Sequence, residues 1–183
     1  MLRLLPLLLL GWLAACSAGR DLAPLPPLES SAYKLGPGDQ IRIITFGEDA
    51  LSEIFRVNDT GSIALPLLGS VAARGLTTDE LGARLAGLLK SRNLMRNPSV
   101  SVEVTEYRPA YVLGEVNKPG QFFYQPGMTV LSAIAVAGGF TYRAVDSVVA
   151  INRVIDGQPV RGNATPTTPI APGDIITVYE RYF

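Results

Sequence analysis

The stretch LGPGDQIRI, residues 35–43, contains a Pro-Gly turn, an acidic residue and then a run rich in β-branched side chains. The stretch IAPGDIITV, residues 170–178, repeats this order. Proline at the second position of a turn and glycine at the third favour a type II turn. The run after each turn indicates a strand. The two copies therefore predict either a repeated structural unit or two unrelated turns, since such tripeptides are common in turns.

The chain between these copies begins with the pattern of a small α+β unit. Thr77 and Glu80 have the spacing of a helix capping box. The helix that follows carries one apolar stripe, made by Leu81, Leu85, Leu88 and Leu89. Pro109 marks a boundary after this unit. Its strands are predicted, from β-branched runs and turn signals, at residues 41–46, 62–67, 69–72 and 99–105.

The second half of the chain has the same kind of pattern. A short helix is predicted over residues 130–137, with Thr129 as its cap and Gly138-Gly139 as its end. Asp156-Gly157 predicts a hairpin turn. Strands are predicted at residues 110–113, 121–124 and 147–154, and a polar loop at 163–169. The fold class is therefore α+β, with two small units that each place one helix against short strands.

The first 15 residues have the pattern of a signal peptide, with one basic residue, Arg3, before an apolar run at 4–13. This run is shorter than the roughly 20 apolar residues that cross a bilayer. The order Leu13-Ala14-Ala15-Cys16 resembles a lipobox, in which the cysteine is lipidated after cleavage. Cys16 is the only cysteine in the chain, so it has no disulfide partner within the protein. The alternative is an ordinary signal peptide that ends beside an incidental cysteine.

Composition excludes several kinds of chemistry. The chain has no histidine, which removes histidine-based catalytic triads and histidine-ligated metals. Sixteen basic residues balance sixteen acidic ones without a basic run, so binding of nucleic acid has no electrostatic basis. No motif for a cofactor or a phosphate is present. We therefore expect no catalytic residues, no metal and no cofactor.

The order of the motifs resembles that of the outer-membrane polysaccharide export lipoproteins. The opening stretch 33–39, the segments 57–63 and 65–69, the leucine-striped helix and the strand 97–102 resemble a polysaccharide export domain. The segments 111–120, 129–134 and 137–140 resemble a soluble-ligand-binding β-grasp (SLBB) domain. The resemblance divides the chain into a signal peptide at 1–15, a lipidated proline-rich tether at 16–32, an export domain at 33–107 and an SLBB domain at 108–183. The second Pro-Gly-Asp copy would supply the closing strand.

By this resemblance, the motif residues serve as structural turns. They are Pro37, Gly38, Asp39, Gly114, Pro119, Gly120, Gly138, Gly139, Pro172, Gly173 and Asp174. The aspartates follow glycine within turns, where a carboxylate most often accepts hydrogen bonds from backbone N–H groups.

The resemblance also implies a function. Such lipoproteins form rings in the periplasm through which capsular or exopolysaccharide leaves the cell, and their partner is an inner-membrane polysaccharide co-polymerase that carries or accompanies a tyrosine kinase. Ser17 after Cys16 favours the outer membrane. The best-known members carry a further C-terminal amphipathic helix, which we do not find here. We therefore expect a periplasmic homo-oligomeric ring or collar, with a separate outer-membrane β-barrel completing the exit.

Two other functions stay open at this point. The first is a monomeric periplasmic ligand-binding lipoprotein that uses its β-grasp unit. The second is an envelope glycan hydrolase, which would need an opposed pair of carboxylates. Glu48, Asp49 and Glu53 are the candidates for that pair, although neighbours in one loop rarely provide such a pair.

Overall fold

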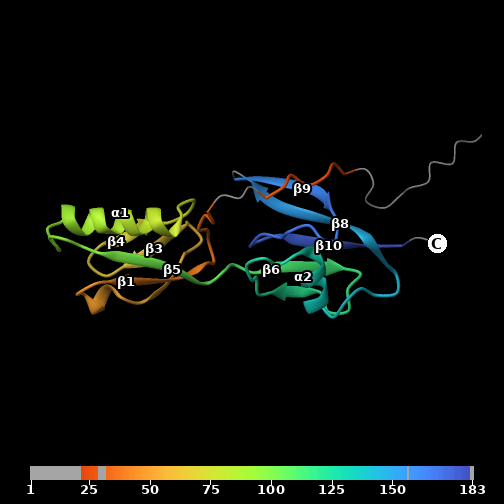
Figure 1. Cartoon of the computed structure of the whole chain (residues 1–183), viewed down its shortest axis with the longest axis horizontal. Helices are drawn as coiled ribbons and strands as arrows, with labels where there is room; N and C mark the ends of the chain where they lie inside the picture. Colours follow the sequence, from red (N-terminus) through yellow and green to blue (C-terminus); the bar gives the residue numbers. More distant parts are fainter. Residues whose placement is uncertain (1–21, 29–31, 156, 182–183) are drawn as a thin grey trace, which may run out of the picture.

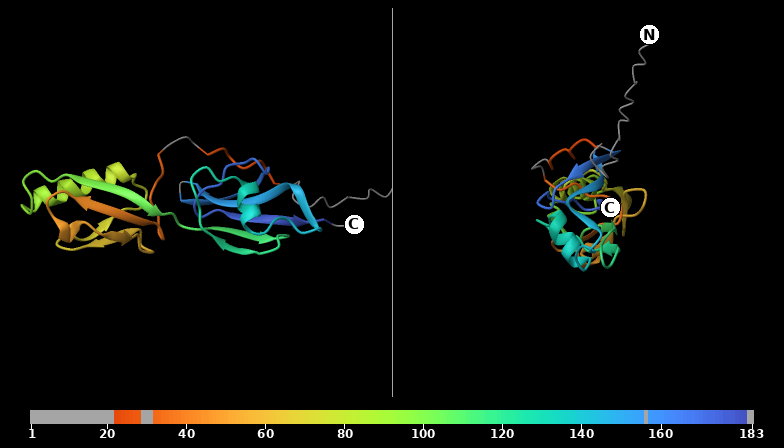
Figure 2. Two further views of the ribbon diagram at one scale, coloured as in Figure 1. Left: turned by 60° about the horizontal axis from the view of Figure 1, so that its bottom comes forward. Right: turned by 90° about the vertical axis from the view of Figure 1, so that its right-hand side faces the viewer.

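The computed structural model describes residues 22–28, 32–155 and 157–181. They form two domains that lie end to end (Figure 1), and both combine strands with one α-helix, as the α+β prediction requires. The chain passes between the domains at residues 107–109. The predicted signal peptide at residues 1–15 and the predicted lipidation site Cys16 lie outside the described residues. Figure 2 shows the same arrangement from two further directions.

The first domain contains a three-stranded antiparallel sheet, a hairpin and a helix. The sheet has the order β2 (Ile54–Arg56), β1 (Gln40–Thr45) and β5 (Val100–Glu106). The hairpin joins β3 (Ser62–Leu65) to β4 (Gly69–Ala72), and a 3₁₀ turn (η1) spans Asp49–Leu51. The helix α1 (Thr78–Ser91) packs against β5. The core between them is aliphatic, and it includes Leu35, Ile41, Ile43, Ile63, Leu81, Leu85 and Leu89.

The predicted capping box of α1 is confirmed. The Thr77 hydroxyl accepts a hydrogen bond from the Glu80 amide at 3.2 Å, and the Glu80 carboxylate accepts one from the Thr77 amide at 2.8 Å. Leu81, Leu85 and Leu89 of the predicted stripe are buried, while Leu88 is partly buried against the same core. The sequence therefore fixes both where this helix begins and which face it buries.

The second domain is one five-stranded sheet with a helix on one face. The helix α2 (Val130–Val136) begins at Thr129, whose side chain accepts a hydrogen bond from the Ser132 amide. The strand β10 lies at the centre of the sheet, parallel to β6 and antiparallel to β8. The strand order is β7 (Gly120–Phe122), β6 (Ala110–Gly114), β10 (Ile175–Glu180), β8 (Ala144–Ile155) and β9 (Gln158–Ala164).

Some strands differ from the sequence prediction. β2 was not predicted, because it has only three residues and no alternation of apolar and polar side chains that would reveal it. β8 extends beyond the predicted range 147–154, and β9 ends inside the predicted polar loop 163–169. β9 has one β-branched residue, Val160, and pairing with β8 rather than its own composition makes it a strand. Gly157 of the predicted hairpin turn has φ +79°, and Asp156 lies outside the described residues.

Residues 22–28, which we call the strap, lie along the second domain (Figures 1 and 2). The Leu25 amide donates to the Asn163 carbonyl of β9 at 2.8 Å, and the Asn163 amide donates to the Ala23 carbonyl at 2.9 Å. Leu25 is buried in the core of the second domain. The sequence predicted an extended tether over 16–32, but in its described part the strap packs against β9. One buried leucine in a proline-rich segment was too weak a signal to reveal this contact.

Candidate functional site: the domain junction

The two Pro-Gly-Asp turns have the same local geometry. Gly38 and Gly173 have φ values of +94° and +88°, which glycine adopts without strain. The Asp39 amide donates to the Gly36 carbonyl at 3.2 Å, and the Asp174 amide donates to the Ala171 carbonyl at 3.1 Å. Each aspartate carboxylate accepts the amide hydrogen of the residue three positions before it, at 2.8 Å in both copies. Each turn thus leads into a strand, β1 or β10, in the same way.

Each of these aspartates is also paired with an arginine. Asp39 and Asp174 are 0% and 1% exposed, so an unpaired carboxylate would be costly at either position. Arg108 donates to Asp39 from its backbone amide at 2.8 Å and from its guanidinium at 3.3 Å. Arg153, which is itself 5% exposed, donates to Asp174 from Nε and from Nη2, the latter at 2.6 Å. Removing either arginine would leave a buried charge without its main partner.

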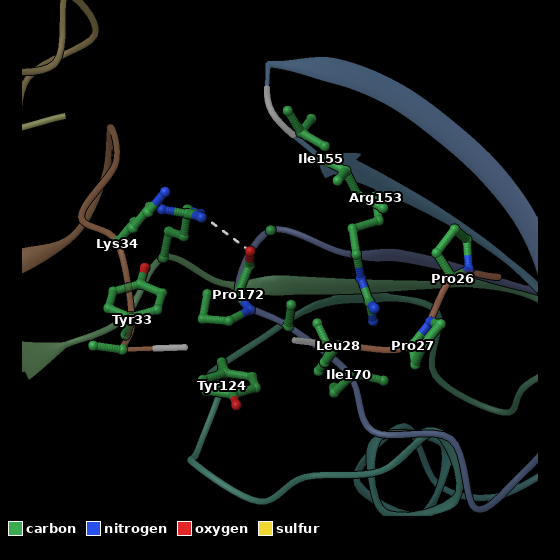
Figure 3. Close-up of a pocket in the computed structure, with 15 residues that line it drawn as sticks. Pro26, Pro27, Leu28, Tyr33, Lys34, Tyr124, Arg153, Ile155, Ile170 and Pro172 are labelled. Atoms are coloured by element: carbon green, nitrogen blue, oxygen red, sulfur yellow. Dashed lines mark hydrogen bonds between the residues drawn. The ribbon is translucent and has the colours of Figure 1, made fainter. Parts of the chain in front are cut away.

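Arg108 connects the two turns and therefore the two domains. Besides its contacts with Asp39 in the first domain, its Nε donates to the carbonyl of Pro172 in the second domain at 3.1 Å (Figure 3). Glycine at the neighbouring positions makes room for this side chain. A Cβ at Gly36 would lie 2.2 Å from an Arg108 nitrogen, and one at Gly173 would lie 3.1 Å from Nε. The two motif copies are thus assembled around one guanidinium, which we call the Arg108 bridge.

Three tyrosines surround this bridge. The ring centroids of Tyr33 and Tyr107 are 5.0 Å apart, and those of Tyr107 and Tyr124 are 5.4 Å apart, both in edge-to-face geometry. The Tyr33 hydroxyl donates to the Asp39 carboxylate, and the Arg108 guanidinium lies 5.5 Å from the Tyr33 ring centroid. Burial raises the pKa of Tyr33 well above its ordinary value, and burial also raises the pKa of Tyr124. These contacts hold the hydroxyl of Tyr33 in its neutral, donating form.

A groove of about 500 Å³ opens beside the Arg108 bridge (Figure 3). Tyr33 and Tyr124 form part of its wall, and the strap closes one side with Pro26, Pro27 and Leu28. Among the residues that the structure describes, the charged side chains lining it are Lys34, Arg108 and Arg153. Within the described residues, no three acidic, histidine or cysteine side chains meet as a metal site. Arg108 and Arg153 are paired with Asp39 and Asp174, so most of the positive charge in this lining is already balanced by buried carboxylates.

The remaining motif residues lie at the other end of the second domain. Gly114 has φ +83°, and a Cβ there would lie 2.1 Å from the Val178 carbonyl oxygen, so β6 and β10 approach closely at this point. Gly138 and Gly139 end α2 with φ values of +82° and +85°. The Asn117 side chain donates to the Gly138 carbonyl at 2.7 Å and ties the connector 115–119 to the helix end. Pro119 is exposed in this connector, and Gly120 begins β7.

The carboxylates proposed for a hydrolase do not form a site of the required kind. Asp49 and Glu53 are exposed on the first domain, Glu48 is partly exposed before the 3₁₀ turn, and none of the three lines the groove. An opposed acid and base would need to face each other across a substrate cleft.

Arg108 and Arg153 are the residues of the junction that were not predicted from the sequence. A signal existed for Arg153, because it follows Val149 and Ile151 on the core side of β8, and a charge at such a position requires a buried partner. For Arg108 the sequence indicated a buried partner only weakly, because it is a charged residue between Tyr107 and Pro109 at the predicted domain boundary. Nothing in the sequence pairs it with two turns that lie 69 and 64 residues away.

No helix among residues 22–28, 32–155 and 157–181 is long and apolar enough to cross a membrane.

The comparisons with known proteins follow this division into two domains. Residues 27–105 match the family described as "Polysaccharide biosynthesis/export protein", and residues 109–164 match the SLBB domain. The Exopolysaccharide production protein ExoF of Rhizobium meliloti (strain 1021) is 35% identical over 137 residues, which are 69% of this chain and 31% of that protein. The Polysialic acid transport protein KpsD of Escherichia coli is 28% identical over 109 residues, which are 58% of this chain and 19% of that protein.

The chain thus spans less than a third of the length of these curated relatives. The matched family and both relatives are named for the biosynthesis, production, export or transport of a polysaccharide, and none of these names describes a glycan hydrolase. With an export domain and an SLBB domain in this order, the chain belongs to the family of polysaccharide biosynthesis/export proteins.

Proposed function

We propose that this protein takes part in the export of a capsular or exopolysaccharide across the outer membrane, as a lipid-anchored periplasmic ring or collar built from several copies. The observation that carries this proposal is the ordered pair of domains joined by the Arg108 bridge. The two relatives are named for production of exopolysaccharide and for transport of polysialic acid, which supports export of a polymer.

The strap supports a definite orientation on the membrane. Six residue steps separate Cys16 from Leu22, so an extended chain between them reaches at most about 22 Å. Asn163 of β9 donates to the Leu22 carbonyl at 3.0 Å, which fixes the strap to the second domain. A lipid on Cys16 would therefore hold the second domain next to the outer membrane. The first domain would then project into the periplasm.

Apolar surface on the second domain supports assembly. The helix α2 has no charged residue, and its outward side chains Leu131 and Val136 are 51% and 57% exposed. Tyr111 and Leu113 are exposed on the opposite face of the sheet, because they alternate with the buried Val112. One copy thus carries two different apolar faces. Contact between unlike faces of neighbouring copies is the arrangement that closes into rings.

The proposal is tested by the native mass and particle images of the lipidated protein in mild detergent. We expect a closed ring, and Leu131→Asp and Leu113→Asp should each reduce it to smaller species. Ser147→Asp, a substitution at an exposed polar position of β8, is the matched control and should leave the ring intact. A monomer both alone and with the inner-membrane co-polymerase would contradict the proposal.

The groove supports one alternative, a monomeric ligand-binding lipoprotein. Its described lining combines proline, tyrosine and aliphatic side chains with Lys34 and with two arginines that are paired with buried aspartates, which favours a small, partly apolar ligand that carries an anionic group. Saturable binding of such a ligand by a protein that stays monomeric would favour this alternative.

A further inference from the structure

The end of the first domain that points away from the second domain exposes large apolar side chains. Three loops meet at this end (Figure 1). One follows the end of β1 at Thr45, one follows the end of α1 at Ser91, and one is the turn between β3 and β4, which lies beside the end of α1. Phe46, Leu67 and Leu94, one from each loop, are 81%, 64% and 42% exposed. We call this surface the tip.

Hydrogen bonds tie the three loops to one another. The Arg92 guanidinium donates to the carbonyls of Leu67 and Leu68 at 3.2 and 3.1 Å. On the other side, the Phe46 amide donates to the Ser99 carbonyl at 3.0 Å. The loop between Arg92 and Ser99, which carries Leu94, is therefore anchored at both ends. The tip is a preorganised surface, which reduces the entropy cost of binding a partner.

The backbone at the tip is strained. Leu67 has φ +62°, and the Leu68 amide donates to the Pro66 carbonyl at 2.6 Å, which is a γ-turn of the rare, positive-φ kind. Asn93, directly before Leu94, has φ +57°. Across the described ranges, these two are the non-glycine residues with positive φ. Positive φ is uncommon for a residue other than glycine, and the Leu67 side chain is 64% exposed, so the fold gains little packing in return for this strain.

The charge at the tip is mostly positive. Lys90, Arg92 and Arg96 are exposed, and the sequence has no acidic residue between Glu80 and Glu103. Glu48 and Asp49 lie on the adjacent loop after Phe46. A complementary surface would therefore place acidic side chains against the loop 90–96 and an apolar hollow against the three exposed side chains.

We propose that the tip docks into a protein held in the inner membrane, whose periplasmic surface presents an apolar hollow with acidic side chains beside it. This inference rests on the proposed function, and it assigns the co-polymerase contact to Phe46, Leu67 and Leu94. The strap is bonded to β9, so a lipid on Cys16, as proposed above, would hold the second domain at the outer membrane and leave the tip as the end that faces away from it. The apolar faces suited to contact between copies lie instead on the second domain.

The first test compares binding of the purified co-polymerase of the same cell, in detergent, to the full lipidated protein and its variants. Leu67→Ser and Leu94→Ser should each weaken binding about tenfold or more, as expected for exposed anchors that become buried in an interface. Tyr142→Ser, at a residue of the second domain that is 86% exposed, is the control and should bind like the wild type. Added salt should weaken the wild-type complex, because part of its attraction is electrostatic.

Leu67→Gly separates docking from a purely structural role. Glycine adopts positive φ without strain, so this variant should unfold at the same temperature as the wild type or higher, while its binding falls. A lower unfolding temperature together with unchanged binding would show that Leu67 serves the fold, and it would overturn the proposal.

Other outcomes also overturn it. If the tip variants bind the co-polymerase as tightly as the wild type, the tip is not the contact surface. If the native mass shows that the tip variants no longer form the ring, the tip is instead a contact between copies of this chain. Tip-dependent binding to vesicles of phosphatidylglycerol and phosphatidylethanolamine, without binding to the co-polymerase, would assign it to a membrane surface. If the protein forms an intact ring that does not bind the co-polymerase, this inference is wrong but the proposed export ring is unaffected. If the protein forms no ring and does not bind the co-polymerase, the proposed function is wrong as well.

Discussion

Arg108 bonds to the turns of both domains at the junction. Its guanidinium is shared between the Asp39 carboxylate and the Pro172 carbonyl, and its backbone amide also bonds Asp39. The arginine side chain is 30% exposed, so water screens part of its attraction to Asp39. The bridge therefore contributes both to stability and to the fixed orientation of the domains.

We expect Arg108→Ala to lower the free energy of unfolding by about 1–3 kcal/mol, because Asp39 stays buried with fewer donors. The variant should also show a broader distribution of interdomain angles by small-angle X-ray scattering. Arg42→Ala, at an exposed position of β1, is the matched control and should change neither quantity. A variant with the stability and scattering profile of the wild type would show that the bridge is incidental.

Tyr33 predicts loss of stability at alkaline pH. Its pKa is raised in the folded protein, chiefly by burial, above the value of about 10 of an unfolded tyrosine. The unfolded chain therefore releases this proton first as pH rises, and stability that is full below pH ~10 falls above it. In denaturant titrations between pH 8 and pH ~11.5, Tyr33→Phe should lose stability less steeply than the wild type. Parallel profiles would contradict this assignment.

At the scale of elements, the strap depends on a glycine in β9. A Cβ at Gly162 would lie 2.7 Å from the Leu25 Cα and 2.8 Å from the Leu25 nitrogen, so Gly162→Ala should displace the strap while β9 keeps its pairing with β8. Hydrogen exchange at the Leu25 amide should rise by at least about tenfold, since its bond to Asn163 is lost.

Gly87→Ala is the control for this experiment. Gly87 lies on the exposed side of α1 with open space around its Cβ position, and alanine there should stabilise the protein by about 0.5–1 kcal/mol. Unchanged exchange at Leu25 in Gly162→Ala would show that the backbone accommodates the methyl group and that the strap does not depend on this glycine.

At the scale of the whole molecule, the strap and the end-to-end domains predict which end faces the membrane. Because Cys16 is the only cysteine, an added cysteine is the single free thiol of the lipidated protein. A fluorophore at Ser147→Cys, on β8 in the second domain, should be quenched by labelled lipid more strongly than one at Asn97→Cys near the tip. Equal quenching at the two positions would contradict the orientation.

Much of the local structure was determined by the sequence itself. The capping box of Thr77, the glycine end of α2 and the turns before β1 and β10 depend on hydrogen bonds between residues at most a few positions apart. Each of these contacts lies within one short segment of the chain, so residue type and spacing were sufficient to predict them. The fold class followed from the same signals, together with the period of the apolar side chains.

The tertiary structure alone decided the arrangement of these segments. β10 lies between β6 and β8, Arg108 bridges turns 69 and 64 residues away, the strap packs on β9, and three loops meet at the tip. Each of these contacts joins residues far apart in the chain. After the local elements have formed, buried charges still need partners, strand edges still need to pair and apolar faces still need to be covered. Which residues meet these needs depends on the whole fold, and no short segment of the sequence carries that information.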